Sequence, residues 1–233
     1  MQKIRLVALL VAPALAAGAS LALAQLPVVP PAPPPPFIDW DKIQIRTIDL
    51  GNRTYMLMGQ GGNITVAVGS EGVMMVDSQF PELSDRIKAA IKQISPLPIK
   101  YLVNTHFHRD HTGGNENFAK DGAVVVAHDN IRVRLAAGTI SMMTGARAAP
   151  RPVEALPKLT YYGGSFTLDI GGRKPQLTHV ANAHTDGDTF NNLRRYQNID
   201  YANGGDVRGM IRALDAYLKV ANDNTKIVPG HGP

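Results

Sequence analysis

His106-Phe107-His108-Arg109-Asp110-His111 places three histidines and one carboxylate in six residues, in a chain of 233 residues that has seven histidines in all. Residues two positions apart in an extended segment point to the same side, so His106 and His108 can offer their imidazoles to one metal ion. On a helix the two side chains would diverge, so the pattern predicts a loop. A carboxylate buried among imidazoles also needs a charged partner. The stretch therefore predicts a metal site rather than a cluster of packed histidines.

The sequence on either side of this stretch supports a loop between two regular elements. Ile99-Lys100-Tyr101-Leu102-Val103, which precedes it, is typical of a buried strand. Gly113-Gly114, which follows it, permits the turn that Asp110 and His111 need in order to approach a second ion, because adjacent residues of an extended chain point apart. A short polar helix is then expected to end near Gly122. The histidine stretch is thus predicted at a strand end, where loops usually present ligands.

Two more histidines lie in Gly-rich loops at predicted strand ends. His184 is part of Ala183-His184-Thr185-Asp186-Gly187-Asp188, and His231 is part of Pro229-Gly230-His231-Gly232-Pro233. Both are candidate metal ligands by the same argument. His128 begins a predicted helix and His179 lies within a predicted strand, so we expect only packing or a local hydrogen bond for these two.

The pattern of the whole chain predicts an α/β sandwich. Short β-rich runs separated by Gly-containing turns are followed by an amphipathic helix over residues 81–94, with Pro81 at its first position. The second half repeats this order, with strands first and then a helix capped by Asp206. A two-layer or four-layer sandwich accounts for this order better than a doubly wound sheet, which needs strict alternation. The expected strands cover residues 43–50, 53–58, 63–68, 73–77, 99–103, 123–127, 159–162, 165–170, 176–181 and 225–228, and the expected helices include 128–135 and one with the apolar positions Val207, Met210, Ile211, Leu214, Leu218 and Ala221.

The histidine motifs, taken in order, resemble the successive metal-binding motifs of the metallo-β-lactamase superfamily. The resemblance runs from about Ile43 to the C-terminus and includes Val76-Asp77-Ser78 and Asn104-Thr105. It implies an α/β fold, an αββα sandwich of two mixed β-sheets flanked by helices. It also implies two Zn²⁺ ions, the first held by His106, His108 and His184 and the second by Asp110, His111 and His231. This ligand set matches the cysteine-free subclass of these lactamases, and a single ion stays an alternative.

The same resemblance implies a zinc-dependent hydrolase. Two zinc ions would lower the pKa of a shared water to about 7 and present hydroxide to a carbonyl, and Asp110 would orient that hydroxide as the catalytic residue. The implied substrate is a small cyclic amide or ester, with a β-lactam the most specific candidate. A thioester or lactone hydrolase of the same fold, and a degenerate metal-binding protein without turnover, are the alternatives.

Several other residues have a less specific pattern. Asp77, Thr185 and Asp188 are expected either to orient ligands or to cap a strand or turn. Residues 136–156 show only a weak pattern, and a flap that covers a site and influences specificity is the expectation there.

The segment between His184 and His231 departs from the family pattern. It has 46 residues, whereas relatives usually place there an additional strand pair ending in Gly-Asp, whose carboxylate bridges the two metals in some branches. Residues 190–198 show no strand-like alternation, so a sandwich that lacks a strand pair after residue 190 stays open beside the complete one. Asp200 or Asp206 would have to replace the bridging carboxylate, and Asp206 is better explained as a helix cap. No bridging residue is therefore assigned.

The N-terminal region predicts export. Lys3 and Arg5 precede an apolar stretch that ends in Ala22-Leu23-Ala24, which is the order of a secretory signal peptide. The expected organisation is a signal peptide over residues 1–24, a Pro-rich linker over residues 25–40 and a metallo-β-lactamase-like domain over residues 41–233. We expect a secreted or periplasmic protein with no stable membrane insertion after cleavage, and an uncleaved membrane anchor is the alternative.

Composition narrows the expected partners. A chain of 233 residues that is 44% hydrophobic and 18% charged suffices for one substantial core. The formal charge of +5 includes Lys3 and Arg5, so the mature charge is about +3, without the clustered basic stripe that nucleic-acid binding requires. The expected partner is a small-molecule substrate, no nucleic acid is expected, and protein partners stay unknown. Because there is no cysteine, the fold is expected to rely on its core and on metal.

Overall fold

The computed structural model describes residues 37–140, 145, 147–189 and 199–232. Contacts divide the chain into one unit over Met1–Pro34 and another over Pro35–Pro233. The predicted signal peptide and most of the predicted linker lie outside the described residues, so their boundaries stay predictions. No helix among the described residues combines the length and the apolar character that a bilayer span requires.

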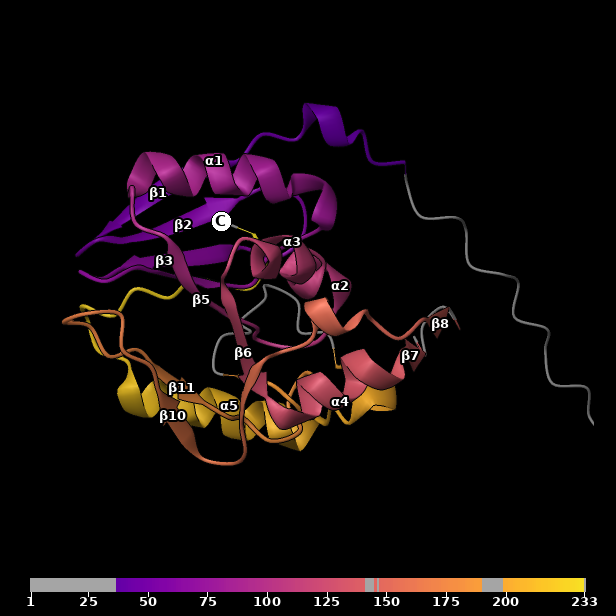
Figure 1. Ribbon diagram of the computed structural model, residues 1–233. Coiled ribbons are helices and arrows are strands. Elements are labelled where there is room, and N and C mark those ends of the chain that lie inside the picture. The colour runs from indigo at the N-terminus through magenta and orange to yellow at the C-terminus, as the bar shows by residue number, and fades with distance from the viewer. Residues whose placement is uncertain (1–36, 141–144, 146, 190–198, 233) are drawn as a thin grey trace, which may run out of the picture. The chain divides into compact units, whose positions relative to one another are not determined.

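The second unit contains a mixed seven-stranded sheet with the strand order β1-β2-β3-β4-β5-β6-β9, shown in Figure 1. Strands β1 to β4 form an antiparallel meander, whereas β4, β5, β6 and β9 run parallel to one another. Parallel neighbours need crossover connections, which here carry the helices. The strands are β1 (Arg46–Gly51), β2 (Thr54–Met58), β3 (Ile64–Val68), β4 (Val73–Val76), β5 (Ile99–Val103), β6 (Val124–His128) and β9 (Leu159–Tyr161).

Both faces of this sheet are buried, because its strands carry apolar side chains on both sides. Val73 and Met75 of β4 pack into one cluster, and Met74 and Val76 pack into another. α1 (Ser84–Ile94) adds Ile87 and its apolar neighbours to the first cluster, as the amphipathic pattern predicted. The second cluster includes side chains from the region of β10 (Ser165–Thr167) and β11 (Gln176–Thr178). The sheet is therefore a central layer with a helix on one side and a second pair of strands on the other.

The predicted α/β fold with a mixed sheet and flanking helices is confirmed, but the second sheet is smaller than expected. In the described residues it is an antiparallel pair, with Ser165 opposite Thr178, where a mixed sheet was predicted. β10 and β11 are also shorter than the alternating runs over residues 165–170 and 176–181. His179 therefore lies beyond β11, in an isolated bridge to Thr189. Residues 190–198, where no strand was predicted, lie outside the described residues.

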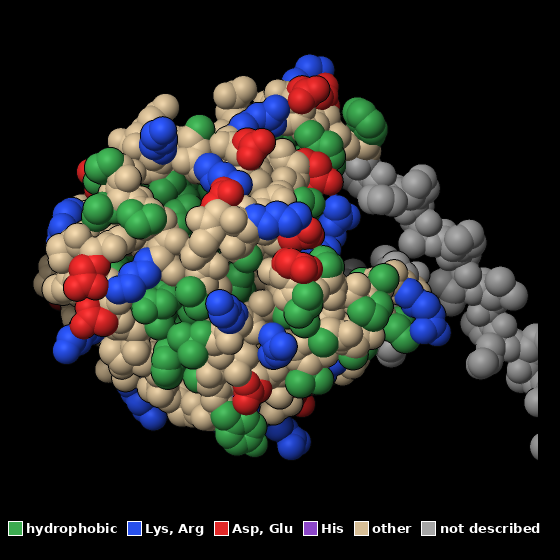
Figure 2. Space-filling view, viewed as in Figure 1, with side chains coloured by type: hydrophobic (Ala, Val, Ile, Leu, Met, Phe, Trp, Pro, Cys, Tyr) green, Lys and Arg blue, Asp and Glu red, His purple; other side chains and the backbone are tan. Residues whose placement is uncertain are grey.

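Three further helices and a small two-stranded ribbon lie in the connections that follow β5 and β6. α2 (Arg109–Thr112) and α3 (Asn115–Lys120) follow β5, and α4 (Asp129–Ala137) follows β6. A two-stranded ribbon of β7 (Thr139–Ile140) and β8 (Arg147–Ala148) forms within the segment for which a flap was predicted. On the face shown in Figure 2, basic and acidic side chains are interspersed rather than gathered by sign.

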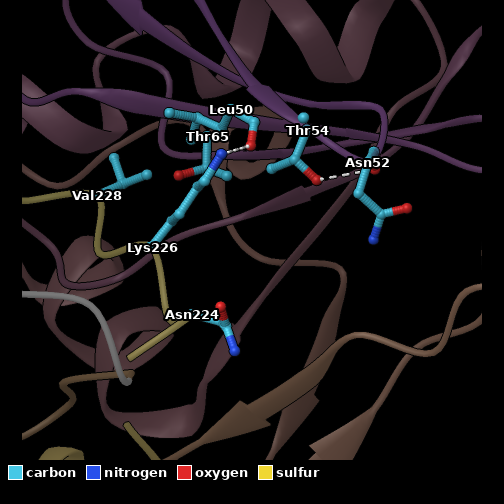
Figure 3. A pocket seen from close by; sticks show the side chains of 8 residues that line it. Leu50, Asn52, Thr54, Thr65, Asn224, Lys226 and Val228 are labelled. Atoms are coloured by element: carbon cyan, nitrogen blue, oxygen red, sulfur yellow. Dashed lines mark hydrogen bonds between the residues drawn. The ribbon is translucent and has the colours of Figure 1, made fainter. Parts of the chain in front are cut away.

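The predicted strand over residues 225–228 is wrong, because this segment joins no ladder among the described residues. It lies beside the β1–β2 hairpin, and Lys226 Nζ donates a hydrogen bond to the carbonyl oxygen of Leu50. Figure 3 shows Lys226 reaching towards Leu50, with Asn224 and Val228 on the same segment. The segment and the hairpin together line a cavity of about 530 Å³. In the described residues this segment is held by a side-chain contact and not by a backbone ladder.

α5 (Val207–Val220) forms where the pattern predicted it, but not all of its apolar positions are buried. Asp206 caps it, accepting hydrogen bonds from Arg208 N and Gly209 N. Met210 and Ala213 pack against Val180 and Ala183. Four of the apolar positions from which the helix was predicted are exposed by 36–75%: Val207, Ile211, Leu214 and Leu218. They lie on the side of α5 away from Met210 and Ala213, which meet the described cluster.

Candidate metal centre

The structure brings together all six side chains that the sequence singled out as ligands. His106 and His108 lie in the loop between β5 and α2, as predicted, and α2 is the turn that carries Asp110 and His111. Ser78 N donates to His111 O at 2.7 Å, so the end of α2 is attached to the segment that follows β4. His184 and His231 approach from turns that lie far along the chain. The six residues form two groups of three.

The first group consists of His106, His108 and His184. His108 Nδ1 lies 3.1 Å from His106 Nε2 and 3.0 Å from His184 Nε2. His106 and His184 are buried, whereas His108 is partly exposed. The three ring nitrogens therefore face one another, and only His108 of the three side chains is partly exposed to solvent.

The second group consists of Asp110, His111 and His231. His111 Nε2 lies 3.0 Å from His231 Nε2, and Asp110 Oδ2 lies 3.1 Å from His231 Nε2 and 3.4 Å from His111 Nε2. His111 is fully buried, and the other two are partly exposed. One carboxylate oxygen and two ring nitrogens thus converge.

The spacing of these donor atoms fits a tetrahedral metal ion. Ligand atoms at about 2.0–2.1 Å from a tetrahedral Zn²⁺ ion lie about 3.3 Å from one another, and the five separations given above run from 3.0 to 3.4 Å. Between two facing ring nitrogens at most one can hold the proton. Imidazole nitrogens and carboxylate oxygens are also common donors to this ion. Each group could therefore hold a divalent metal.

Asp77, just after β4, connects the two groups. Its Oδ2 accepts hydrogen bonds from His111 Nδ1 and from Thr105 Oγ1, both at 2.7 Å. Thr105 Oγ1 lies 3.0 Å from His106 Nδ1 and can accept a hydrogen bond from that ring. These contacts leave Nε2 of both rings directed into their groups. Of the two roles expected for Asp77, the geometry supports the orientation of ligands.

Asp200 orients the ring of His108 in the same way. Its Oδ2 accepts from His108 Nε2 at 2.8 Å and from Asn203 Nδ2 at 2.7 Å, so His108 presents Nδ1 to the first group. Asp200 therefore contacts the far nitrogen of His108, as an orienting residue would. Asp206, the other carboxylate considered as a bridge, is the cap of α5.

Asp188 and Thr185 form the turn that presents His184. The Asp188 carboxylate accepts hydrogen bonds from the backbone nitrogens of His184 at 2.5 Å and Thr185 at 2.9 Å, and from Thr185 Oγ1 at 2.5 Å. Burial raises the pKa of Asp188 to about 7. Among the two expected roles, these contacts correspond to the capping of a turn.

In the second group, the neighbouring histidines keep Asp110 in its anionic form. Burial acts to raise the pKa of Asp110, but hydrogen bonds from His111 and His231 outweigh it and hold this pKa well below its usual range. Burial likewise acts to lower the pKa of His111, but the negative charges of Asp77 and Asp110 outweigh it and raise this pKa to about 9. A metal that binds His111 below about pH 9 must therefore displace a proton.

Two residues that support the centre were not identified from the sequence. A Cβ atom at Gly62 would lie 2.2 Å from His111 Cε1, so only glycine leaves room for this ring. Asn63 Nδ2 donates to Pro229 O at 2.9 Å and to Gly232 O at 2.6 Å, which holds the turn that carries His231. Pro229 is 166 positions from Asn63, and in the sequence the glycine indicated only a turn.

His128 and His179 lie outside both groups and stack on each other, with ring centroids 3.7 Å apart. His128 Nδ1 accepts a hydrogen bond from Asn130 N at 3.3 Å at the start of α4, and His179 Nδ1 donates to Asp188 O at 3.0 Å. Packing and local hydrogen bonds, as predicted, account for both rings. Burial and the nearby charge of His179 lower the pKa of His128 to about 4.

We expect the metal-free protein to lose stability as the pH falls from about 6.5 to about 4. In this window His128 is protonated in the unfolded chain but not in the folded protein, so acid favours unfolding. His128→Asn keeps an acceptor that caps α4 but does not titrate. Its free energy of unfolding in urea and EDTA should fall less between about pH 7.5 and about pH 4.5 than that of the parent. An equal fall in the two proteins would contradict this role of His128.

Comparisons with known proteins agree with the fold. The sequence pattern of the Metallo-beta-lactamase superfamily matches residues 57–190. A metallo-beta-lactamase from Pontibacter korlensis is similar in structure, with a TM-score of 0.64 at 19% identity over 82% of this chain and 92% of that chain. A class B3 di-zinc metallo-beta-lactamase from an Alaskan soil metagenome has a TM-score of 0.62 at 17% identity over 84% of this chain and 83% of that chain.

A curated relative matches a shorter region. The coenzyme F420H(2) oxidase of Methanothermobacter marburgensis is 29% identical over 80 residues, which are 33% of this chain and 18% of the oxidase. The chain thus spans less than a fifth of that relative's length. At these identities the structural likeness concerns the fold, and the activity has to be argued from the residues of the centre.

Proposed function

Because this chain belongs to the metallo-beta-lactamase superfamily and has the fold of a metallo-hydrolase, we propose that it is a dizinc hydrolase of a small cyclic amide or ester, with a β-lactam the leading candidate. The observation that carries the proposal is the pair of three-donor groups with separations of 3.0–3.4 Å. His106, His108 and His184 would hold one ion, and Asp110, His111 and His231 would hold the other.

The donor set favours zinc, and the chain's own residues define what each side chain does. Zinc held in such groups supplies Lewis acidity, which lowers the pKa of water to about 7 and polarises a carbonyl oxygen. Asp110 stays anionic because of His111 and His231, so its carboxylate can accept a hydrogen bond from the attacking water and orient it. Asp77 and Asp200 keep the imidazoles in the required orientation. No serine or cysteine nucleophile is needed.

A cavity beside His108 supports a small anionic substrate. It has a volume of about 430 Å³, and the described residues that line it include four arginines and no acidic residue. Arg134 is paired with Asp186 at 2.6 Å and Arg109 with Glu82 at 3.4 Å. The other two, Arg147 and Arg151, form no ion pair with a described carboxylate. A β-lactam with a carboxylate beside its ring suits this lining.

Export is part of the proposal. The order of Lys3 and Arg5, an apolar stretch and Ala22-Leu23-Ala24 supports a cleaved signal peptide. The mature enzyme would then be secreted or periplasmic, where it would meet a small molecule from outside the cell.

The test combines metal analysis with three substrates. Purified protein should contain about two equivalents of zinc by plasma mass spectrometry, and it should hydrolyse a chromogenic β-lactam faster than a lactone or a glutathione thioester. EDTA should remove the activity and added Zn²⁺ should restore it. If the lactone or the thioester is turned over faster, that compound replaces the β-lactam as the proposed substrate. Bound zinc without turnover of any of the three substrates would contradict the proposal that the protein is a hydrolase.

A further inference from the structure

α5 presents an exposed apolar stripe that follows the heptad spacing of a helix pair. Val207, Ile211, Leu214 and Leu218 are exposed by 50%, 55%, 36% and 75%. Their spacing of four, three and four residues places them on one side of the helix, in the pattern of a two-helix seam. Met210 and Ala213 occupy the buried side. We call these four residues the α5 stripe.

A contiguous stripe of this kind is unusual on a monomer, because exposed apolar side chains are normally scattered. The described residues that pack against α5 lie on its other side, where Met210 and Ala213 meet Val180 and Ala183. We propose that the α5 stripe is covered by the α5 stripe of a second copy of this chain, with the two helices antiparallel about a two-fold axis. An isologous contact needs a surface that complements itself, and the stripe has this property.

The apolar positions match in the antiparallel arrangement. Pairing Ile211 with the partner's Leu214 also pairs Val207 with the partner's Leu218, and the symmetry repeats both contacts. A larger and a smaller apolar side chain thus meet at each end of the seam, as in knobs-into-holes packing.

The charges beside the stripe are complementary in the same register. Arg208 and Asp215 lie seven residues apart and therefore on the same edge of the stripe. In the antiparallel pair, Arg208 lies beside the partner's Asp215, and Asp215 beside the partner's Arg208. Neither side chain forms an ion pair with another described residue. A parallel pair would leave the two charges about 10 Å apart along the axis.

The expected dimer is weak. α5 has 14 residues and is about 21 Å long, so the stripe buries less than the roughly 800 Å² per partner of a standard interface. We expect a dissociation constant in the micromolar range.

Sedimentation of the full chain with its metals, from about 1 to about 200 μM, should show a monomer and dimer in equilibrium. Ile211→Glu and Leu218→Glu should each weaken the dimer at least about 100-fold, because a carboxylate would be buried in the seam. Val133→Glu is the matched control, since Val133 is also apolar and 64% exposed but lies on α4. A monomer over the whole range, or an association that Val133→Glu weakens as much, overturns the proposal.

Charge reversal tests the register. Arg208→Asp and Asp215→Arg should each weaken the dimer about 3-fold to 10-fold, and the double variant should restore it. Circular dichroism shows whether each variant keeps its fold. Failure of the double variant to recover, with the fold intact, overturns the pairing of Arg208 with the partner's Asp215.

Because the chain has no cysteine, disulfide trapping gives an independent test. Val207→Cys and Leu218→Cys proteins should form a crosslinked dimer when mixed and oxidised, whereas neither protein should do so alone. Crosslinking of each variant alone indicates parallel helices and overturns the proposal, as does the absence of any crosslink in the mixture.

Discussion

Replacing Asp110 with alanine is expected to lower kcat/KM for hydrolysis by about 10³-fold or more. Asp110 contributes its Oδ2 to the second group, at 3.1 Å from His231 Nε2, and it is held anionic by His111 and His231. On the proposed function, the variant loses both a metal ligand and the carboxylate that orients water. Steady-state kinetics at saturating Zn²⁺, together with the metal content of the purified variant, measure the two effects separately.

Asp85→Ala is the matched control for this variant. Asp85 is a fully exposed carboxylate on α1, far along the chain from either group. It should retain parental kcat/KM and metal content. Parental turnover by Asp110→Ala, with one or two metals bound, would exclude Asp110 from the chemistry.

Replacing Asp77 with asparagine should weaken metal binding by about 10-fold to 100-fold, although Asp77 belongs to neither group. Its Oδ2 accepts from His111 Nδ1 and Thr105 Oγ1, each at 2.7 Å, so one carboxylate orients a ligand of each group. Asparagine keeps the volume, but one of its two terminal atoms is an NH2 donor, whereas both oxygens of Asp77 accept hydrogen bonds, Oδ1 from Thr105 N at 2.8 Å. We therefore expect the affinity of both metals to fall, which a competition titration with a zinc chelator measures.

Asp206→Asn provides the comparison for Asp77→Asn. Asparagine caps a helix about as well as aspartate does, so the loss of a carboxylate at the start of α5 should leave the metal affinities unchanged. If Asp77→Asn binds both metals as tightly as the parent, the hydrogen bonds of Asp77 do not contribute to metal affinity.

The four candidate ligands within residues 106–111 were predictable because short-range geometry places them together, whereas His184 and His231 were predicted from their Gly-rich motifs. His106 and His108 lie two residues apart in an extended loop, and Gly113-Gly114 follow the turn of α2. Strands β1 to β6 followed from β-rich runs between Gly-containing turns. The errors gather in the second half, where the 225–228 segment joins no ladder and the α5 stripe is exposed. An apolar pattern reports what could be buried, whereas burial itself depends on a neighbouring element.

The sequence by itself predicted the six candidate ligands, from the histidine motifs and their resemblance to a known family, and it predicted the meander and the amphipathic helices from residue type and local periodicity. Only the tertiary structure decided which nitrogen of each ring faces its group. Asp77, Thr105 and Asp200 set this choice by hydrogen bonds to the opposite nitrogens of His111, His106 and His108. Gly62 and Asn63 likewise act on residues far along the chain. Such contacts arise only when the folded sheet brings distant loops together, so no local pattern in the sequence predicts them.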